Sequence, residues 1–149
     1  MSPKDFDPNC LFCKIIAGQI PCLRVFQDDA VLAFLDVGPL AEGHLLLVPK
    51  EHYLRLEEMP PEAVVAITRH LPFLGRAVMK ATGSTAYNVL ENNGPEAGQA
   101  VPHVHFHVIP RVQGDGVFDH WPSGKYPEGK MEAIASAIRK NLECLSGGA

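Results

Sequence analysis

This chain of 149 residues has no long hydrophobic run, no excess of positive charge and no apolar segment at its start. Its longest apolar stretches, HLLLVP and AVVAI, fall far short of the roughly 20 residues that cross a bilayer, so no membrane span is expected. Lys and Arg number 13 against 17 Asp and Glu, and this net charge of -4 gives no electrostatic footprint for nucleic acid. The opening MSPKDFDPNC lacks the apolar core of a secretion signal. We therefore expect a cytoplasmic protein, with the nucleus as a second compartment.

Cysteine is also scarce, because the chain has only four, and two of these, Cys10 and Cys13, form a CxxC pair. In a protein that is not secreted, such a pair is more typical of metal binding or redox chemistry than of a structural disulfide. The composition is otherwise that of a soluble globular protein, with 46% hydrophobic and 20% charged residues and no internal repeat. The length predicts a single domain.

Hydrophobic spacing predicts an α+β fold in which an antiparallel sheet carries one long helix and a C-terminal helix packed on it. The long helix begins at the Pro60-Pro61 pair and ends at Gly83, and Pro72 inside it predicts a kink. Residues 1–9 form a loose lead-in, 10–112 the core, and 113–149 a loop and helix of the same domain. The expected strands cover residues 24–27, 31–35, 44–50, 85–91 and 102–110.

The most informative stretch is HVHFHVIPR, which places His103, His105 and His107 on alternate positions. In a strand these three side chains share one face, while the apolar residues between them face the long helix. Crowded imidazoles need partners if they are buried, so a purely structural role is disfavoured. A zinc site made of histidines and catalysis by one imidazole both remain open.

The loop before this strand, NNGPEAGQAV, favours phosphorus chemistry. A glycine-rich bend leaves backbone amides unshielded, and such a concavity binds phosphate oxygens. Gln99 adds neutral side-chain donors beside it. Alone the loop is weak evidence, but next to three in-line histidines it indicates a site for a phosphate group.

HVHFHVI resembles the signature of the histidine triad (HIT) proteins, in which three histidines alternate with apolar residues. The resemblance extends to CLFCKIIAGQIP, LAFLDVGPLAEGHLLLVPKEH and NNGPEAGQAVPHVHFHVIPR, in family order, over roughly residues 10 to 112. It implies a HIT-like α+β fold, a homodimer, and hydrolysis of nucleoside phosphoramidates or dinucleoside polyphosphates. A purine nucleotide would be the substrate, and neither nucleic acid nor a membrane would be a partner.

By this resemblance, His105 is the nucleophile that attacks the α-phosphorus and carries the nucleotidyl group until water releases AMP. Its other ring nitrogen needs an acceptor, for which we expect a backbone carbonyl. His103 belongs to the same catalytic triad. The phosphate is expected to contact His107, Gln99, Asn92 and the backbone amides near Gly98 and Ala100. Asp36 would accept from the ribose hydroxyls, and His44 would lie beside the triad. The base would pack against Leu11, Phe12, Ile15, Phe34 and Val37.

The CxxC pair resembles the zinc-containing branch of the family. There, two N-terminal cysteines join a histidine that follows PK and the first triad histidine, which are Cys10, Cys13, His52 and His103 in this chain. Such a closed tetrahedral set implies one structural zinc per chain rather than a catalytic one.

The chain departs from many relatives at Ala100, where a Ser or Thr hydroxyl would donate to the leaving group. His107 in the third triad position favours a hydrolase over a nucleotidyl transferase. The preferred function is a purine nucleoside phosphoramidase. There are two alternatives. One is a dinucleoside polyphosphate (diadenosine tri- or tetraphosphate) hydrolase, and the other is a nucleotide-binding module with incidental activity. The segment 111–128, which includes Trp121, is expected to contribute to substrate selection or to a dimer interface.

Overall fold

The computed structural model describes residues 6–118 and 120–147. The chain divides into two compact units, Met1–Val117 and Phe118–Ala149. In chain order the helices and strands are α1 (Leu11–Ile16), β1 (Arg24–Gln27), β2 (Val31–Leu35), β3 (Leu45–Pro49), α2 (Pro61–Thr68), α3 (Leu71–Thr82), β4 (Ala86–Glu91), β5 (Phe106–Arg111) and α4 (Lys130–Ser146). Short 3₁₀ turns cover Leu56–Glu58 and Pro95–Ala97.

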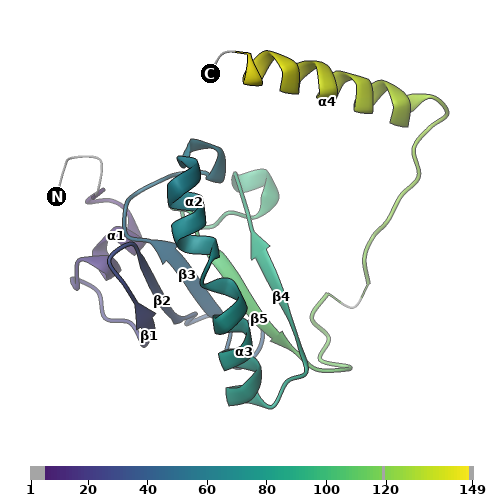
Figure 1. The fold of residues 1–149 in the computed structure, drawn as a ribbon. Helices are drawn as coiled ribbons and strands as arrows, with labels where there is room; N and C mark the ends of the chain where they lie inside the picture. Colours follow the sequence, from purple (N-terminus) through teal and green to yellow (C-terminus); the bar gives the residue numbers. More distant parts are fainter. Residues whose placement is uncertain (1–5, 119, 148–149) are drawn as a thin grey trace. The chain divides into compact units, whose positions relative to one another are not determined.

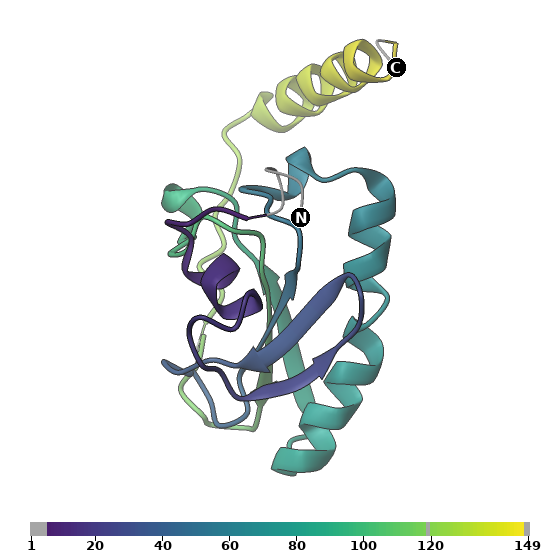
Figure 2. The same ribbon diagram turned by 90° about the vertical axis from the view of Figure 1, so that its left-hand side faces the viewer.

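The first unit is built on a five-stranded sheet in the order β1-β2-β3-β5-β4, and every strand pair in it is antiparallel. Helices α2 and α3 lie on one face of the sheet (Figure 1), and the short α1 lies on the opposite face (Figure 2). The predicted α+β class with an antiparallel sheet is therefore confirmed.

Strand β3 is buried along its whole length because both faces of the sheet are covered. Leu45 and Leu47 pack in the core beneath α2 and α3, while Leu46 and Val48 pack in a second core with α1. The alternation continues in β5, where Phe106 and Val108 join the α2/α3 core as predicted. His107 pairs with Leu46 and therefore shares the α1 face of the sheet.

Two of the predicted elements differ from the structure by more than a residue or two. The single kinked helix is two helices, because the chain breaks at residues 69–70 and Pro72 lies in the first turn of α3, where its missing N–H costs nothing. The strand predicted over residues 102–110 begins only at Phe106. Before it, the amide of Val104 donates to the Tyr53 carbonyl (2.8 Å) instead of to a neighbouring strand.

Two local features hold the sheet in register and α3 on its face. The carboxylate Oδ1 of Asp28 accepts from the amides of Ala30 (2.8 Å) and Val31 (2.9 Å) and so closes the β1–β2 turn. Gly75 on α3 lies directly against Tyr87 of β4, and a Cβ there would come within 2.4 Å of the tyrosine ring. Only glycine allows this approach.

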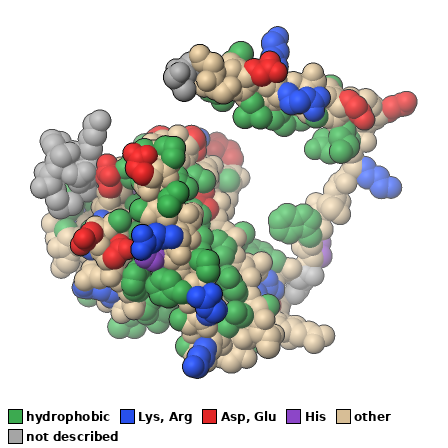
Figure 3. Space-filling view, viewed as in Figure 1, with side chains coloured by type: hydrophobic (Ala, Val, Ile, Leu, Met, Phe, Trp, Pro, Cys, Tyr) green, Lys and Arg blue, Asp and Glu red, His purple; other side chains and the backbone are tan. Residues whose placement is uncertain are grey.

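The second unit contains α4, an amphipathic helix whose hydrophobic side chains gather along one side (Figure 3). Ile138, Leu142 and Leu145 on this side are 55%, 58% and 77% exposed. The assignment of residues 113–149 to the same domain as 10–112 stays a prediction. Among the described residues, no helix combines the length and the apolar character that a membrane crossing requires.

Candidate active site and metal centre

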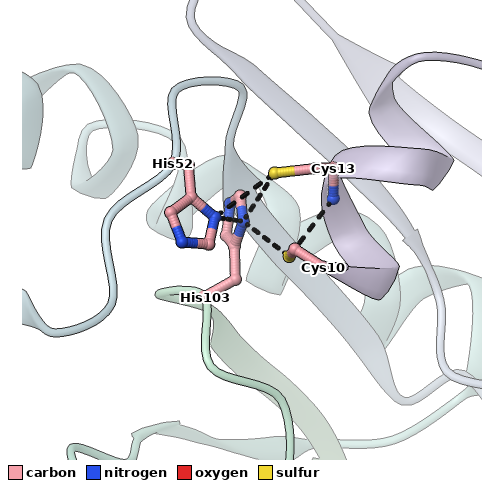
Figure 4. A group of neighbouring side chains, drawn as sticks. All are labelled: Cys10, Cys13, His52 and His103. Atoms are coloured by element: carbon pink, nitrogen blue, oxygen red, sulfur yellow. Dashed lines mark hydrogen bonds between the residues drawn. The ribbon is translucent and has the colours of Figure 1, made fainter. Parts of the chain in front are cut away.

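Four potential metal ligands converge between α1, the segment after β3 and the approach to β5. The side chains of Cys10, Cys13, His52 and His103 point toward one another (Figure 4). Nδ1 of His103 lies 3.4 Å from Sγ of Cys10 and 3.7 Å from Sγ of Cys13. Nδ1 of His52 lies 3.2 Å from both Sγ of Cys13 and Nδ1 of His103. The structure thus brings together all four ligands that the sequence predicted.

These distances fit a tetrahedral zinc ion. Zn–S bonds of about 2.3 Å and Zn–N bonds of about 2.0–2.1 Å place neighbouring ligand atoms about 3.3–3.8 Å apart. The ring of His103 has the required tautomer, because its Nε2–H donates to the carbonyl of Pro49 (2.9 Å) and leaves Nδ1 bare. The pKa of His103 is lowered to about 4, chiefly because the ring is buried, and the imidazole is therefore neutral. The donor set is one that could hold a metal.

One ring nitrogen of His105 forms a hydrogen bond, and the other has no hydrogen-bond partner among residues 6–118 and 120–147. Its Nδ1 donates to the backbone carbonyl of His103 at 2.7 Å, which is the type of acceptor that we expected. The proton is therefore on Nδ1, and the lone pair of Nε2 is available for attack. Burial lowers the pKa of His105, and the ring packs edge-on against Phe12 with centroids 5.1 Å apart. The side chain is only 4% exposed, yet it lines a cavity.

That cavity, of about 230 Å³, lies on the α1 face of the sheet. Its predicted lining residues are Leu11, Phe12, Ile15, Phe34, Asp36, Val37, Ala100, His105 and His107. The walls from α1 and β2 are apolar, while Asp36, His105 and His107 supply most of the side-chain polarity. Larger cavities lie elsewhere: two of about 380 Å³ border α3 and one of about 260 Å³ lies along α4, and none of the three is lined by a histidine. Chemistry rather than volume therefore identifies the candidate active site.

His107 is held by a chain of hydrogen bonds that runs behind the cavity. The amide of Leu40 donates to Nδ1 of His44 (3.1 Å), so the proton of His44 is on Nε2. That Nε2–H donates to Nδ1 of His107 (2.8 Å), which leaves the proton of His107 on its own Nε2. The chain therefore turns His107 into a hydrogen-bond donor. Burial, followed by the charges of His105 and His44, lowers the pKa of His107 to about 4.

The carboxylate of Asp36 lies at the end of β2, beside this chain. Its Oδ1 accepts from the amide of Gly38 (2.8 Å), and Oδ2 is 3.7 Å from Nε2 of His44. Asp36, His44 and His107 are close enough to be considered as a second metal group. The tautomer of His44 argues against this, because its Nε2 carries the proton and cannot bind a cation at the same time.

The glycine-rich loop lies next to the segment that contains His52. Gln99 uses its side chain internally, because Oε1 accepts from the amide of Gly94 (2.8 Å) and Nε2 donates to the carbonyl of Leu54 (2.7 Å). Asn92 lies close to Gly98, its Nδ2 being 3.8 Å from where a Cβ on that glycine would be. The residues predicted for the site that do not line the cavity are His44, Asn92, Gly98, Gln99 and His103.

The HIT domain model matches residues 17–114, which span the sheet, the loop and the three histidines. The chain belongs to the histidine triad family. Among curated HIT relatives, "Adenylylsulfatase HINT3" of Arabidopsis thaliana is 50% identical over 107 residues, or 72% of this chain and 54% of that protein. "Adenosine 5'-monophosphoramidase hnt1" of Schizosaccharomyces pombe is 40% identical over 136 residues, or 91% of this chain and 99% of that protein.

A solved HIT structure also bears on the metal centre. The "ZN-bound histidine triad family protein" of Mycobacterium smegmatis has a TM-score of 0.70 and 31% identity, and the match covers 95% of this chain and 98% of that one. A HIT protein that is similar in fold to this chain therefore binds zinc. This finding and the Cys/His geometry agree that the four-ligand group is suited to a metal.

Sequence reasoning missed several groups that shape the site. Pro21, Cys22 and Val101 line the cavity, but they lie in segments without a periodic pattern. The amide of Leu40 and the carbonyl of Pro49 set the tautomers of His44 and His103. Backbone groups leave no sequence signal, so only the fold could reveal them.

Proposed function

We propose that this HIT protein is a hydrolase that cleaves purine nucleoside phosphoramidates at the α-phosphate and releases AMP. The arrangement of His105 carries the proposal: its Nδ1–H is bound by the carbonyl of His103, and its Nε2 is left as a nucleophile in a cavity that also contains Asp36. The family and the phosphoramidase named in fission yeast support the same chemistry.

In the first step, Nε2 of His105 forms a bond to the α-phosphorus and the P–N bond to the amine breaks. The positive charge of the nucleotidyl-imidazole is stabilised by the carbonyl of His103. The departing nitrogen takes its proton from solvent, because Ala100 offers no hydroxyl. In the second step, water attacks the phosphorus and loses a proton to solvent, the P–Nε2 bond breaks, AMP leaves and the lone pair returns to Nε2. Dividing one displacement into two is the benefit of covalent catalysis.

The other residues bind and orient the nucleotide in this proposal. The Nε2–H of His107 and the amides near Gly98 and Ala100 donate to phosphate oxygens, where negative charge accumulates in the transition state. Asn92 assists there, and Gln99 shapes the loop through its bonds to Gly94 and Leu54. Asp36 accepts from the ribose hydroxyls. The base packs among the apolar residues Leu11, Phe12, Ile15, Phe34 and Val37.

We further propose one structural zinc per chain, held by Cys10, Cys13, His52 and His103. A cation there supplies no catalytic step, because four protein ligands leave no open position for substrate or water. It would link α1, which forms a wall of the cavity, to the residues just before β5. Metal binding would thereby contribute directly to folding.

We also propose a homodimer. Two surfaces support it: β4 lies at an edge of the sheet and, among the described residues, pairs with β5 alone, and the apolar side of α4 is exposed. Exposed strand edges and large apolar stripes are both typical of association surfaces. A cytoplasmic or nuclear location, and the exclusion of nucleic acid as a partner, stay predictions.

A second candidate substrate class has a better leaving group than an amine. Without a hydroxyl at Ala100, cleavage favours leaving groups that need no proton, such as the sulfate of an adenylyl sulfate or the nucleotide of a dinucleoside polyphosphate. The Arabidopsis relative named as an adenylylsulfatase supports the first of these.

The test is AMP release from adenosine phosphoramidate, adenylyl sulfate and diadenosine triphosphate. His105→Ala should abolish turnover of all three, while His70→Ala, at a histidine that bonds Asp28 and does not line the cavity, is the matched control. Fastest turnover of the phosphoramidate supports the first proposal, and fastest turnover of either other substrate supports the second. If His105→Ala retains wild-type activity, or if AMP binds but no substrate is cleaved, the proposed catalytic role is wrong.

A further inference from the structure

The segment after the metal ligand His52 makes three consecutive attachments to the active site. The carbonyl of Tyr53 accepts from the amide of Val104 (2.8 Å), between His103 and His105. The carbonyl of Leu54 accepts from Nε2 of Gln99 (2.7 Å). The amide of Leu56 donates to Oδ1 of Asn93 (2.8 Å). Residues 52–56, the linking segment, therefore begin at the metal group and end on the glycine-rich loop.

The side chain of Asn93 is fixed at both ends. While Oδ1 accepts from Leu56, Nδ2 donates to Oε2 of Glu91 at the end of β4. The other oxygen of Glu91 is buried and has no hydrogen-bond partner among the described residues, so the Asn93 amide is the carboxylate's side-chain anchor. The amide group of Asn93 cannot rotate without losing both bonds.

The loop itself is stiffened at the same place. Gly94, next to Asn93, is buried at φ +92°, and Arg55 of the linking segment lies so close that a Cβ on Gly94 would be 3.0 Å from its Nη2. Gln99 binds the amide of Gly94 from the other side (2.8 Å). The phosphate loop, residues 92–100, has a 3₁₀ turn of its own at Pro95–Ala97, and contacts with the linking segment hold the loop in place from outside.

We propose that Asn93 is a positioning residue that joins the phosphate loop to the linking segment, so that metal binding at His52 and phosphate binding at the loop are coupled. The inference rests on the proposed function, because it assigns phosphate recognition to this loop. Asn93 does not touch the substrate. It acts by holding the loop amides in the arrangement that the phosphate needs, while His52 anchors the other end of the segment.

Coupling of this kind is reciprocal, which supplies a readout that does not depend on catalysis. If the metal improves the affinity for AMP by some factor, AMP must improve the affinity for the metal by the same factor. We expect roughly a 5- to 10-fold increase, at the lower end of typical coupling. In Asn93→Ala the factor should fall toward 1, although the bond from Gln99 to Leu54 remains, and kcat of the metal-loaded enzyme should fall about 10-fold.

The experiment measures Zn²⁺ affinity of the full chain by competition with a chromogenic chelator, with and without saturating AMP. Wild type is compared with Asn93→Ala, with Glu91→Gln, which keeps an acceptor for Asn93, and with Asn141→Ala, at an exposed asparagine of α4 that donates to the Ala137 carbonyl of its own helix. Glu91→Gln and Asn141→Ala should retain the wild-type factor. If Asn93→Ala does not fold, Asn93→Ser, whose side chain is too short to reach both partners, takes its place.

Each outcome is decisive. A wild-type factor of 1, in a protein that binds AMP and hydrolyses substrate, overturns the coupling while leaving the proposed function intact. A wild-type factor that persists in Asn93→Ala overturns the role of Asn93. If the wild-type protein neither binds AMP nor turns over any nucleotide, the proposed function fails and the inference fails with it.

Discussion

His44 offers the sharpest test of the hydrogen-bond chain behind the active site. It is 2% exposed, its Nδ1 accepts a hydrogen bond from the amide of Leu40, and its Nε2 donates one to Nδ1 of His107. His44→Leu keeps a buried side chain of similar size but removes both bonds. Because an unsatisfied buried polar group costs about 1–3 kcal/mol, we expect the free energy of unfolding to fall by about 2 kcal/mol.

The same substitution should lower kcat more than it changes KM. Without the donor from residue 44, Nδ1 of His107 can itself carry the proton, and its Nε2 then no longer donates to the phosphate. The net free energy of one hydrogen bond is about 1.4 kcal/mol, and its loss in the transition state corresponds to about a 10-fold decrease in kcat. Steady-state hydrolysis of adenosine phosphoramidate measures this, and urea unfolding measures the stability.

Two comparisons separate this effect from simple destabilisation. His70→Leu removes another buried histidine, which bonds Asp28 (2.8 Å) far along the chain from the triad, so it should reduce stability but not kcat. In a His107→Ala background, His44→Leu should lower kcat no further, because the two residues act through one bond. An equal loss of kcat with and without His107, or an unchanged kcat in His44→Leu, would refute the tautomer argument.

Three further predictions follow from the site. Ala100→Ser should restore a donor to the leaving group and raise kcat for the phosphoramidate on the order of 10-fold. For adenylyl sulfate, whose leaving group needs no proton, kcat should rise little. Equal increases in kcat on both substrates would contradict this prediction. The pKa of His107 is lowered from 6.5 to about 4, chiefly by burial, so the folded chain binds fewer protons than the unfolded chain between these values. The free energy of unfolding therefore keeps this contribution in full above about pH 6.5 and loses it as the pH falls toward 4, by at most about 3 kcal/mol. Urea unfolding at a series of pH values measures this loss. In His107→Gln the free energy of unfolding should change less steeply with pH. Cys13→Ser should weaken the metal site and lower the melting temperature, whereas Cys144→Ser, at an exposed position, should leave it unchanged.

The chemistry of this protein could be predicted from the sequence where residue type and local spacing carry it. The alternation in HVHFHVI predicted that Phe106 and Val108 enter the core under the long helical segment, on the face opposite to His107, since that depends only on the period of an extended chain. The bounds of β1 and β2 were predicted correctly, because β-forming residues act locally. The four metal ligands were predicted from the family resemblance, and they do meet in space.

Other features could not be predicted, because they depend on groups that meet only in the folded chain. The strand of the triad begins at Phe106 because Tyr53, some fifty residues earlier, takes the amide of Val104. Gln99 looks in the sequence like a phosphate ligand, yet both ends of its side chain bind the protein's own backbone.

The sequence by itself thus determined the family, and it predicts which imidazole is reactive and which four residues would bind a metal, because residue type and spacing are written in it directly. Only the tertiary structure decided which ring nitrogen of His44, His103 and His105 carries the proton. Each of these protons is set by a backbone amide or carbonyl, and every residue has both, so the sequence cannot distinguish the one that comes within hydrogen-bond distance.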